Sequence, residues 1–266
     1  EEAPKGARLS SLSRQVARCR AVPLAKGRYV AIPWERLEPV LSVLAELYDG
    51  TGRKLRLHEA NLAAVGRLEQ ALEGDGRVLH WTGRADAVER GKMLVRGPAG
   101  AERPVVLHAE LRPYQQDGLT WLCHLRDHGV GGVLADDMGL GKTLQTIALL
   151  AIEKEQRRMD LPALVIVPTS LIEGWRRQIA QFAPHLRVLV LHGGKRHAEF
   201  HKVAATDVVL TTYSVLSRDL SRFHEHEFHY VILDEAQAIK NARSQASQAV
   251  RTLRARHRLA LTGTPV

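Results

Sequence analysis

The sequence contains few of the residues that build disulfide-rich, zinc-binding or membrane-spanning proteins. Cys19 and Cys123 are its only cysteines, too few for a disulfide framework or for a zinc site on their own. Such usage fits a reducing compartment. No apolar run approaches the ~20 residues of a bilayer-spanning helix, and no secretory signal opens the chain. We therefore expect a cytoplasmic protein with no membrane partner and, because the first residue is Glu1 rather than Met, an excised piece of a longer one.

The remaining composition is typical of a globular protein with a basic surface. The 266 residues are 45% hydrophobic and 25% charged, which suits one large domain or two smaller ones. The formal net charge is +9, and the excess of basic residues is spread over both halves of the chain. A polyanionic partner is compatible with this charge, and so is a plain solvated surface. Charge alone does not decide the function.

The pattern divides the chain into an accessory region, residues 1–108, and a main domain, residues 109–266. In the first, residues 29–32 have strand composition, and apolar side chains recur at helical spacing in 37–47 and 62–72. The Gly- and Pro-containing stretch 97–104 is typical of a linker. No catalytic constellation is found before it, and Trp34 and Trp81 are interpreted as packing residues. We expect a small α+β region there.

From residue 107 onward, short apolar strands alternate with segments of helical period. Strands are expected at 133–135, 163–167, 188–191, 208–211, 230–234 and 259–262, and helices around 119–125, 143–152, 170–182, 197–204 and 243–253. Such an alternation predicts an α/β fold with a mainly parallel sheet covered by helices on both faces. Ligands of such sheets bind at the carboxyl ends of the strands.

The stretch GVLADDMGLGKTLQTI, residues 132–147, has the order of a phosphate-binding P-loop: strand, glycine loop, Lys-Thr and helix. Gly139 and Gly141 let backbone N–H groups approach phosphate oxygens, and the helix N-terminus faces the anion. Lys142 is expected to reach the β- and γ-phosphates, and the Thr143 hydroxyl to bind Mg²⁺. The generic pattern begins with glycine, where this chain has Asp136.

A second acidic motif completes the P-loop. The apolar residues 231–233 lead into Asp234 and Glu235, as a buried strand does when it delivers a carboxylate to the edge of the sheet. We expect Asp234 to hold Mg²⁺, directly or through water, and Glu235 to orient or deprotonate the attacking water. Alone, this pattern is more often a solvated acidic turn. Together with the P-loop in an alternating α/β pattern, it predicts nucleotide hydrolysis.

Six motifs now stand in one order: LRPYQQDGLTWL, LADDMGLGKTLQTIA, LVIVPTSLIEGW, LTTYSVL, DEAQAIKN and LALTGTP. Over residues 107–266 the chain closely resembles the first, RecA-like motor lobe of the SWI/SNF-type ATPases of helicase superfamily two. In this family ADDMGLGKT is the usual form of the loop, which accounts for Asp136. The DEAQ form resembles the bacterial branch, and residues 1–108 resemble, more loosely, an accessory region that precedes the motor there.

The resemblance implies ATP as the nucleotide and extends the predicted site. Gln115 matches the glutamine that recognises adenine, and Gln116 is its less favoured neighbour. Gln237 matches the residue that couples the γ-phosphate to the cleft between two lobes. The complete set predicted to bind the nucleotide is Gln115, Met138, Gly139, Leu140, Gly141, Lys142, Thr143, Leu144 and Gln237, with Thr143 and Asp234 on Mg²⁺ and Glu235, Lys142 and Asp234 as catalytic residues.

The resemblance also implies contacts with the backbone of duplex DNA and a role in movement. Pro168, Thr169 and Ser170, and then Thr211, Thr212 and Tyr213, match segments that touch phosphates. Thr262, Gly263 and Thr264 match the motif that links hydrolysis to movement. Because none of these contacts reads base edges, binding independent of sequence is expected, with strong salt dependence. The family moves along double-stranded DNA and shifts bound proteins, which implies a location at the nucleoid.

Several alternatives remain open. The family's second lobe carries arginine fingers, so we expect the 266 residues alone to bind ATP weakly and to hydrolyse it poorly. An RNA-directed helicase, or a nucleotide-gated module that recruits a protein such as RNA polymerase through residues 1–108, would share the same motifs. The His- and Glu-rich residues 224–229 are interpreted as a solvated loop rather than a metal site, and Trp175 as packing. Residues 224–229 and Trp175 therefore stay outside the predicted site.

Overall fold

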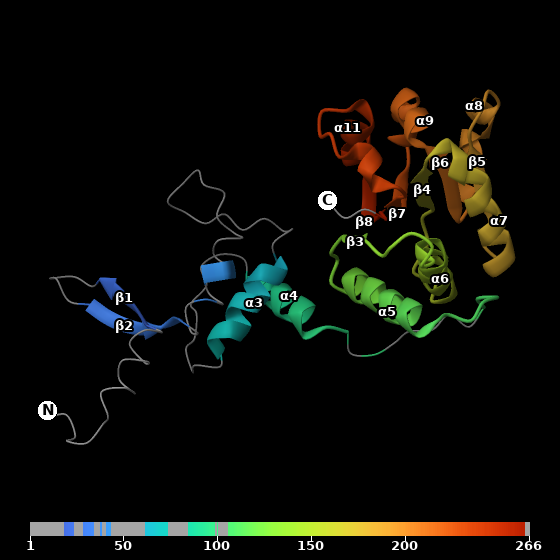
Figure 1. Ribbon diagram of the computed structural model, residues 1–266. Coiled ribbons are helices and arrows are strands. Elements are labelled where there is room, and N and C mark those ends of the chain that lie inside the picture. Colours follow the sequence, from blue (N-terminus) through green and yellow to red (C-terminus); the bar gives the residue numbers. More distant parts are fainter. Residues whose placement is uncertain are drawn as a thin grey trace, which may run out of the picture. The chain divides into compact units, whose positions relative to one another are not determined.

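The computed structural model describes residues 19–23, 29–34, 38, 41–43, 62–73, 85–98, 100 and 106–263. The chain divides into two compact units, residues 1–96 and residues 97–266. Figure 1 labels their helices and strands. The predicted boundary at residue 108 differs from this division, because Val106 and His108 belong to the second unit: the Val106 N–H donates to Glu155 and the His108 N–H donates to the Phe182 carbonyl.

The described part of the first unit consists of a strand pair and two helices. β1 (Cys19–Pro23) pairs antiparallel with β2 (Tyr29–Pro33), and α3 (Leu62–Glu73) packs against α4 (Ala85–Arg96). α3 was expected from its apolar spacing, whereas α4 was not. The two helices come so close that a Cβ added to Gly66 would lie 2.1 Å from the Gly91 carbonyl oxygen, so only glycine fits there. Most of the helix expected over 37–47, and Trp81, lie outside the described residues.

The second unit is built on a six-stranded sheet in the order β3-β8-β7-β4-β6-β5, with every neighbouring pair parallel. This confirms the predicted α/β fold. Its strands are β3 (Gly132–Leu134), β4 (Ala163–Val167), β5 (Val188–Leu191), β6 (Val208–Thr212), β7 (Glu227–Leu233) and β8 (Arg254–Leu261). Within the described residues, no helix is long and apolar enough to cross a membrane.

Helices cover both faces of this sheet (Figure 1). One face packs on α5 (Pro113–Asp127), α6 (Lys142–Glu155) and α7 (Ile172–Phe182). The other packs on α8 (Arg196–Glu199) with the 3₁₀ segment Phe200–Ala205, and on α9 (Tyr213–Arg218), α10 (Leu220–Phe223) and α11 (Gln245–Thr252). β4 shows the reason: alternate residues enter the two cores, and all five are fully buried. Two 3₁₀ turns, Thr169–Leu171 and Ala236–Ile239, follow β4 and β7.

Two boundaries differ from the prediction for physical reasons. β8 begins at Arg254, whereas the prediction began at Leu259. Its first residues alternate exposed arginines with half-buried Ala255 and His257. This pattern has too few apolar residues to indicate a buried strand. β7 begins at Glu227, inside the segment interpreted as a solvated loop. His229 is therefore buried in β7, not in solvent, and its Nε2 hydrogen-bonds to Glu153 over 2.7 Å.

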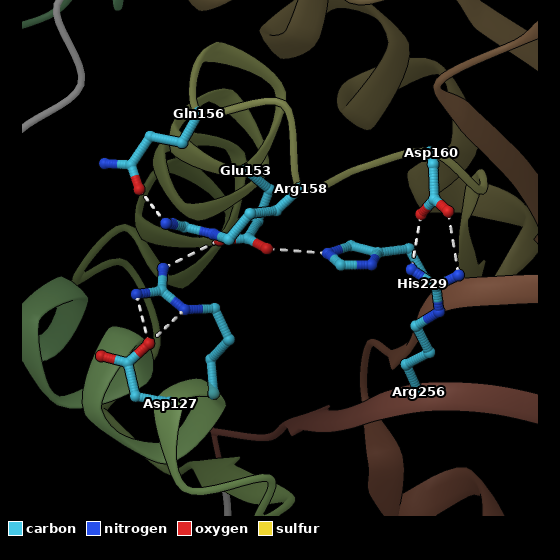
Figure 2. A network of polar contacts seen from close by, with 8 residues as sticks. Asp127, Glu153, Gln156, Arg158, Asp160, His229 and Arg256 are labelled. Atoms are coloured by element: carbon cyan, nitrogen blue, oxygen red, sulfur yellow. Dashed lines mark hydrogen bonds and ion pairs between the residues drawn. The ribbon is translucent and has the colours of Figure 1, made fainter.

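Glu153 is the centre of an ionic network at the amino-terminal edge of the sheet (Figure 2). This carboxylate, at the end of α6, is fully buried and pairs with Arg126 at 2.8 Å and with Arg158 at 2.7 Å. Burial raises its pKa, but the hydrogen bonds from His229 and Arg158 and the charge of Arg126 outweigh burial and hold the pKa at about 2. A second acid, Asp207, lies before β6 and pairs with Lys154 and Arg187. Glu153 and Asp207 are thus both paired with cations.

Candidate active site

The P-loop follows β3 and enters α6 at the carboxyl-terminal edge of the sheet. Gly139 and Gly141 have φ values of +86° and +82°, a region that side chains disfavour. Gly141 directly precedes α6, and no side chain caps this helix end. The first N–H groups of α6 therefore lack an intrahelical partner, which makes this turn a cradle for an anion.

Lys142 closes on its own loop. Its ammonium donates to the backbone carbonyl of Asp136 at 2.6 Å and to that of Asp137 at 2.9 Å. A phosphate bound in the cradle would compete for the same ammonium with a full negative charge, which makes the stronger hydrogen bond. The lysine is thus held at the mouth of the loop.

Asp136, the residue that replaces the usual first glycine, is anchored by its side chain. Its Oδ2 accepts a hydrogen bond from Nε2 of Gln145 at 3.1 Å, and Gln145 is fully buried in α6. Glycine could not make this contact. The departure from the generic pattern therefore joins the start of the loop to the helix that follows it.

Gln115, predicted to recognise adenine, is buried beneath the P-loop. Its Oε1 accepts from the Arg112 N–H at 3.0 Å, and its Nε2 donates to the Leu140 carbonyl at 3.1 Å. The amide thus ties the start of α5 to the loop. Gln116, the less favoured neighbour, lines a cavity of about 480 Å³ formed by residues 107–117. The two glutamines therefore lie in different environments, and Gln115 is the one that contacts the loop.

The other predicted loop residues differ in exposure. Met138 is 72% exposed and Leu140 is exposed, whereas Thr143 and Leu144 are half-buried at the start of α6. Gly263, predicted to link hydrolysis to movement, lies beside Met138, because a Cβ built on it would approach Met138 Cγ to 2.6 Å. The segment after β8 therefore contacts the P-loop directly.

Asp234 and Glu235 follow β7 at the same edge. Oδ1 of Asp234 accepts from the Glu235 N–H at 2.9 Å, and Oδ2 accepts from the indole Nε1 of Trp175 at 2.8 Å. Burial raises the pKa of Asp234 above its ordinary value and the charge of Glu235 adds to this, while the Trp175 bond opposes it. Glu235 itself has a φ of +51°, a strained value for a residue with a side chain.

A relay of side chains connects Glu235 to the end of β8. Nε2 of Gln237 donates to Oε2 of Glu235, and the Thr262 hydroxyl donates to Oε1 of Gln237 at 2.9 Å. Residues predicted from two separate motifs, DEAQ and LTGTP, are therefore in one line of hydrogen bonds. Thr264, predicted together with Thr262 and Gly263, lies outside the described residues.

The two segments predicted to touch DNA present different surfaces. Thr169 and Ser170 are exposed, and Pro168 is half-buried before them. By contrast, the buried Thr211 hydroxyl donates to the Leu191 carbonyl at 3.0 Å. Thr212 is buried too, and its side-chain oxygen caps α9 by accepting from the Val215 N–H. These two hydroxyls face the protein interior and form hydrogen bonds within the protein, and contact of this segment with DNA stays a prediction.

Tyr213, the third residue of the second segment, also points inward. Its hydroxyl donates to the backbone carbonyl of Asp234 at 2.7 Å. Burial raises the pKa of this phenol, and the charges of Asp234 and Glu235 add to the effect, so the hydroxyl keeps its proton. Tyr213 is thus a partner of the acidic motif.

One cleft of about 360 Å³ brings the two motifs together. It is lined by Met138, Gly139, Gly141, Lys142, Thr143, Leu171, Gly174, Trp175, Gln178, Asp234 and Glu235. The Lys142 ammonium and the N–H cradle suit the phosphates of a nucleoside triphosphate. The Thr143 hydroxyl and the two carboxylates suit a hard cation, which prefers oxygen ligands. Among the described residues, no three His, Cys, Asp or Glu side chains gather in a metal-binding group.

Sequence reasoning missed the contribution of α7 to this cleft. Trp175 was interpreted as packing, and it does lie in the core, only 2% exposed. Its indole N–H, however, reaches Asp234, 59 residues away in sequence. No spacing rule connects such distant positions, so only the parallel placement of β4 beside β7 reveals the contact.

Comparisons with known proteins agree with this geometry. A family model described as SNF2-related domain matches residues 114–266. The putative ATP-dependent helicase/translocase YwqA of Bacillus subtilis is 46% identical over 160 residues, which are 59% of this chain and 17% of that protein. The TATA-binding protein-associated factor MOT1 of Saccharomyces cerevisiae is 41% identical over 176 residues, 61% of this chain and 9% of that protein.

A solved structure with a similar fold is the SWI2/SNF2 ATPase core of Sulfolobus solfataricus in complex with double-stranded DNA. It is 44% identical, with a TM-score of 0.59, over 62% of this chain and 34% of that one. The chain therefore spans a small part of the length of these relatives.

Proposed function

The chain belongs to the SNF2-related family of helicase superfamily two, and on this premise we propose that the intact protein uses ATP hydrolysis to move along double-stranded DNA and displace or remodel bound proteins. The observation that carries the proposal is the cleft in which Lys142, Thr143, Asp234 and Glu235 meet. These are the groups that ATP hydrolysis needs, and they come from two motifs far apart in sequence.

The roles of the residues follow from their positions. Lys142 would exchange its loop carbonyls for phosphate oxygens. The Thr143 hydroxyl and Asp234 would hold Mg²⁺, which would supply positive charge to the phosphates of the bound nucleotide. Glu235 orients the attacking water and accepts its proton. Gln237 and Thr262 hold Glu235 in place through their hydrogen bonds, so displacement of the segment after β8 would move the general base.

Contact with DNA is proposed on the side of the exposed residues Thr169 and Ser170. They open the 3₁₀ turn before α7, and hydroxyls and backbone N–H groups of this kind bind phosphates without reading bases. The similar SWI2/SNF2 core in complex with double-stranded DNA supports contact with DNA as such, and so does the net charge of +9. Such a motor would act where chromosomal DNA lies, on cargo such as RNA polymerase or another DNA-bound protein.

The 266 residues alone are proposed to hydrolyse ATP slowly. Of the described residues that line the cleft, Lys142 is the only cation. In related hydrolases an arginine finger supplied from outside the P-loop domain adds roughly 10³–10⁵ in rate. A second lobe would have to bring such a group.

The test is the ATPase rate of the intact protein with duplex DNA, single-stranded DNA and RNA side by side. We expect duplex DNA to stimulate most, and the stimulation to fall steeply with salt. Greater stimulation by RNA would favour an RNA-directed helicase instead. Binding of a protein partner without any nucleic-acid stimulation would favour the nucleotide-gated module.

Two substitutions in the intact protein separate binding from chemistry. Glu235→Gln should keep ATP binding but lower hydrolysis by about 10²–10⁴-fold, whereas Lys142→Ala should weaken binding itself. Lys202→Ala, an exposed lysine away from the cleft, is the control for loss of a positive charge. Unchanged turnover in Glu235→Gln would remove Glu235 from the role of general base.

A further inference from the structure

Two aromatic side chains reach the same acidic residue from the two segments that were predicted to contact DNA. Trp175 donates its indole N–H to Oδ2 of Asp234 at 2.8 Å, and Tyr213 donates its hydroxyl to the Asp234 backbone carbonyl at 2.7 Å. Trp175 lies on α7, which directly continues the turn Thr169–Leu171. Tyr213 directly follows Thr212 at the end of β6.

We propose that Trp175 and Tyr213 are positioning residues that couple DNA contact to the metal-binding carboxylate Asp234. The inference rests on the proposed function, because it needs both DNA at the exposed turn before α7 and Mg²⁺ at Asp234. It goes further by identifying a direct connection between them. Each tether is a single side-chain hydrogen bond, one from α7 behind that turn and one from the residue that follows β6.

The geometry of Asp234 explains why two tethers matter. One carboxylate oxygen is held by Trp175 and the other by the Glu235 N–H, which fixes the rotation of the carboxylate. Each oxygen keeps a further lone pair for a cation. The Tyr213 bond fixes the backbone of the same residue, so both the position and the orientation of the carboxylate are set by partners outside the P-loop.

The path from each segment to Asp234 is short and rigid. Trp175 is 2% exposed and lies about one turn into α7, so a shift of the preceding turn moves the indole with the helix. Asp234 itself is bonded to the strand that precedes the turn, because its N–H donates to the Ile166 carbonyl at 2.9 Å. DNA that displaces α7 against β4 would therefore change the Trp175 contact while this backbone contact stays.

The test measures reciprocal coupling in the intact protein. The dissociation constant of a fluorescent, non-hydrolysable ATP analogue with Mg²⁺ is determined with and without duplex DNA, and the Mg²⁺ requirement is titrated separately. Coupled sites typically change one another's affinity by about 5-fold or more, and by the same factor in both directions. DNA affinity is therefore also measured with and without the analogue.

The variants are Trp175→Phe, Tyr213→Phe and the double variant, with Trp121→Phe and Tyr230→Phe as controls. Trp175→Phe keeps an aromatic ring but removes the N–H, and Tyr213→Phe removes only one oxygen atom. Trp121 is an exposed tryptophan on α5, and Tyr230 is a buried tyrosine earlier on β7. Each control makes the same chemical change away from Asp234.

We expect each single variant to lower the coupling factor, the double variant to bring it near one, and both controls to leave it unchanged. Trp175→Phe should also weaken Mg²⁺ binding by roughly 10–100-fold, as loss of a bond that orients a metal ligand does. Thermal unfolding of every variant checks the fold. If Trp175→Phe is misfolded, Tyr213→Phe decides alone.

The outcomes separate the inference from the proposed function. If DNA changes neither hydrolysis nor nucleotide affinity in the unsubstituted protein, the proposed function fails and the coupling with it. If DNA acts on the unsubstituted protein and equally on the double variant, the coupling through Trp175 and Tyr213 is refuted while the DNA motor stands.

Discussion

Buried carboxylates at the two ends of the parallel strands have pKa values shifted in opposite directions. At the amino-terminal edge, Glu153 and Asp207 are paired with cations, and although burial raises the pKa of each, their basic partners hold it at about 2. At the carboxyl-terminal edge, Asp234 is buried with a raised pKa, and within the described residues no basic side chain forms an ion pair with it. Lys142 donates to backbone carbonyls instead.

This difference indicates that the amino-terminal edge of the sheet stabilises the fold, whereas the carboxyl-terminal edge carries the reactive groups. Removing one partner of a buried ion pair strongly destabilises a fold, because the other charge stays buried without compensation. In the network of Figure 2, Glu153 is paired with both Arg126 and Arg158. At the carboxyl-terminal edge, Asp234 and Glu235 can instead pair with a cation that arrives with a ligand. Glu235 also has a strained backbone conformation. Strained residues and destabilised carboxylates are common at functional sites, where activity is favoured over stability.

The same isosteric change should lower the free energy of unfolding far more at the amino-terminal edge than at the carboxyl-terminal edge. Glu153→Gln leaves Arg126 and Arg158 without their buried counter-charge and should lower the free energy of unfolding by about 3–5 kcal/mol. Glu235→Gln, at a half-buried site whose amide partner Gln237 can still donate, should change it by less than about 0.5 kcal/mol. Denaturant unfolding of both variants measures this. Equal losses would contradict the division between the edges.

Acidification should remove the difference between the original chain and Glu153→Gln. Because the folded pKa of Glu153 is about 2, below the ordinary 4.5, its stabilisation is fully present above about pH 5. It is lost as the pH falls toward 2, and amounts to about 3 kcal/mol at 1.36 kcal/mol per unit. Asp234 has the opposite sign: its raised pKa destabilises the fold above its ordinary range and offsets part of the loss in acid.

The measurement is the free energy of unfolding of both chains between pH 7 and pH 2. The two curves should converge at the acid end, and the variant should show the shallower slope. Parallel curves over this range would mean that Glu153 does not carry the pH dependence of the amino-terminal edge.

The sequence was sufficient for the parts of the molecule that repeat a physical pattern. β4 and β5 have the predicted bounds, because a fully apolar or strongly apolar run can only be a buried strand here. The P-loop residues and the acidic pair also line one cleft. What could not be predicted depends on contacts between distant segments. Trp175 at Asp234 and His229 at Glu153 are examples, since packing rather than spacing brings them together.

The P-loop offers a smaller test, because one amide joins it to α5. Gln115→Ala removes the bond to the Leu140 carbonyl and the cap on the Arg112 N–H, and should raise the dissociation constant for ATP several-fold. Gln116→Ala is the matched control. If ATP and GTP then bind equally only in Gln115→Ala, this glutamine recognises adenine. If the preference is lost in Gln116→Ala instead, the cavity beside it holds the base.

The smallest effect is expected where an ion pair of the amino-terminal edge is exposed. Arg256 and Asp160 form two hydrogen bonds, at 2.5 and 2.9 Å, but their side chains are 43% and 61% exposed. Water and salt screen such a pair, and ordering two long side chains opposes it. Arg256→Gln should therefore leave the unfolding midpoint unchanged at physiological salt, while Arg126→Gln lowers it clearly. A comparable loss in both would show that pairing alone, rather than burial of the pair around Glu153, gives this edge its stability.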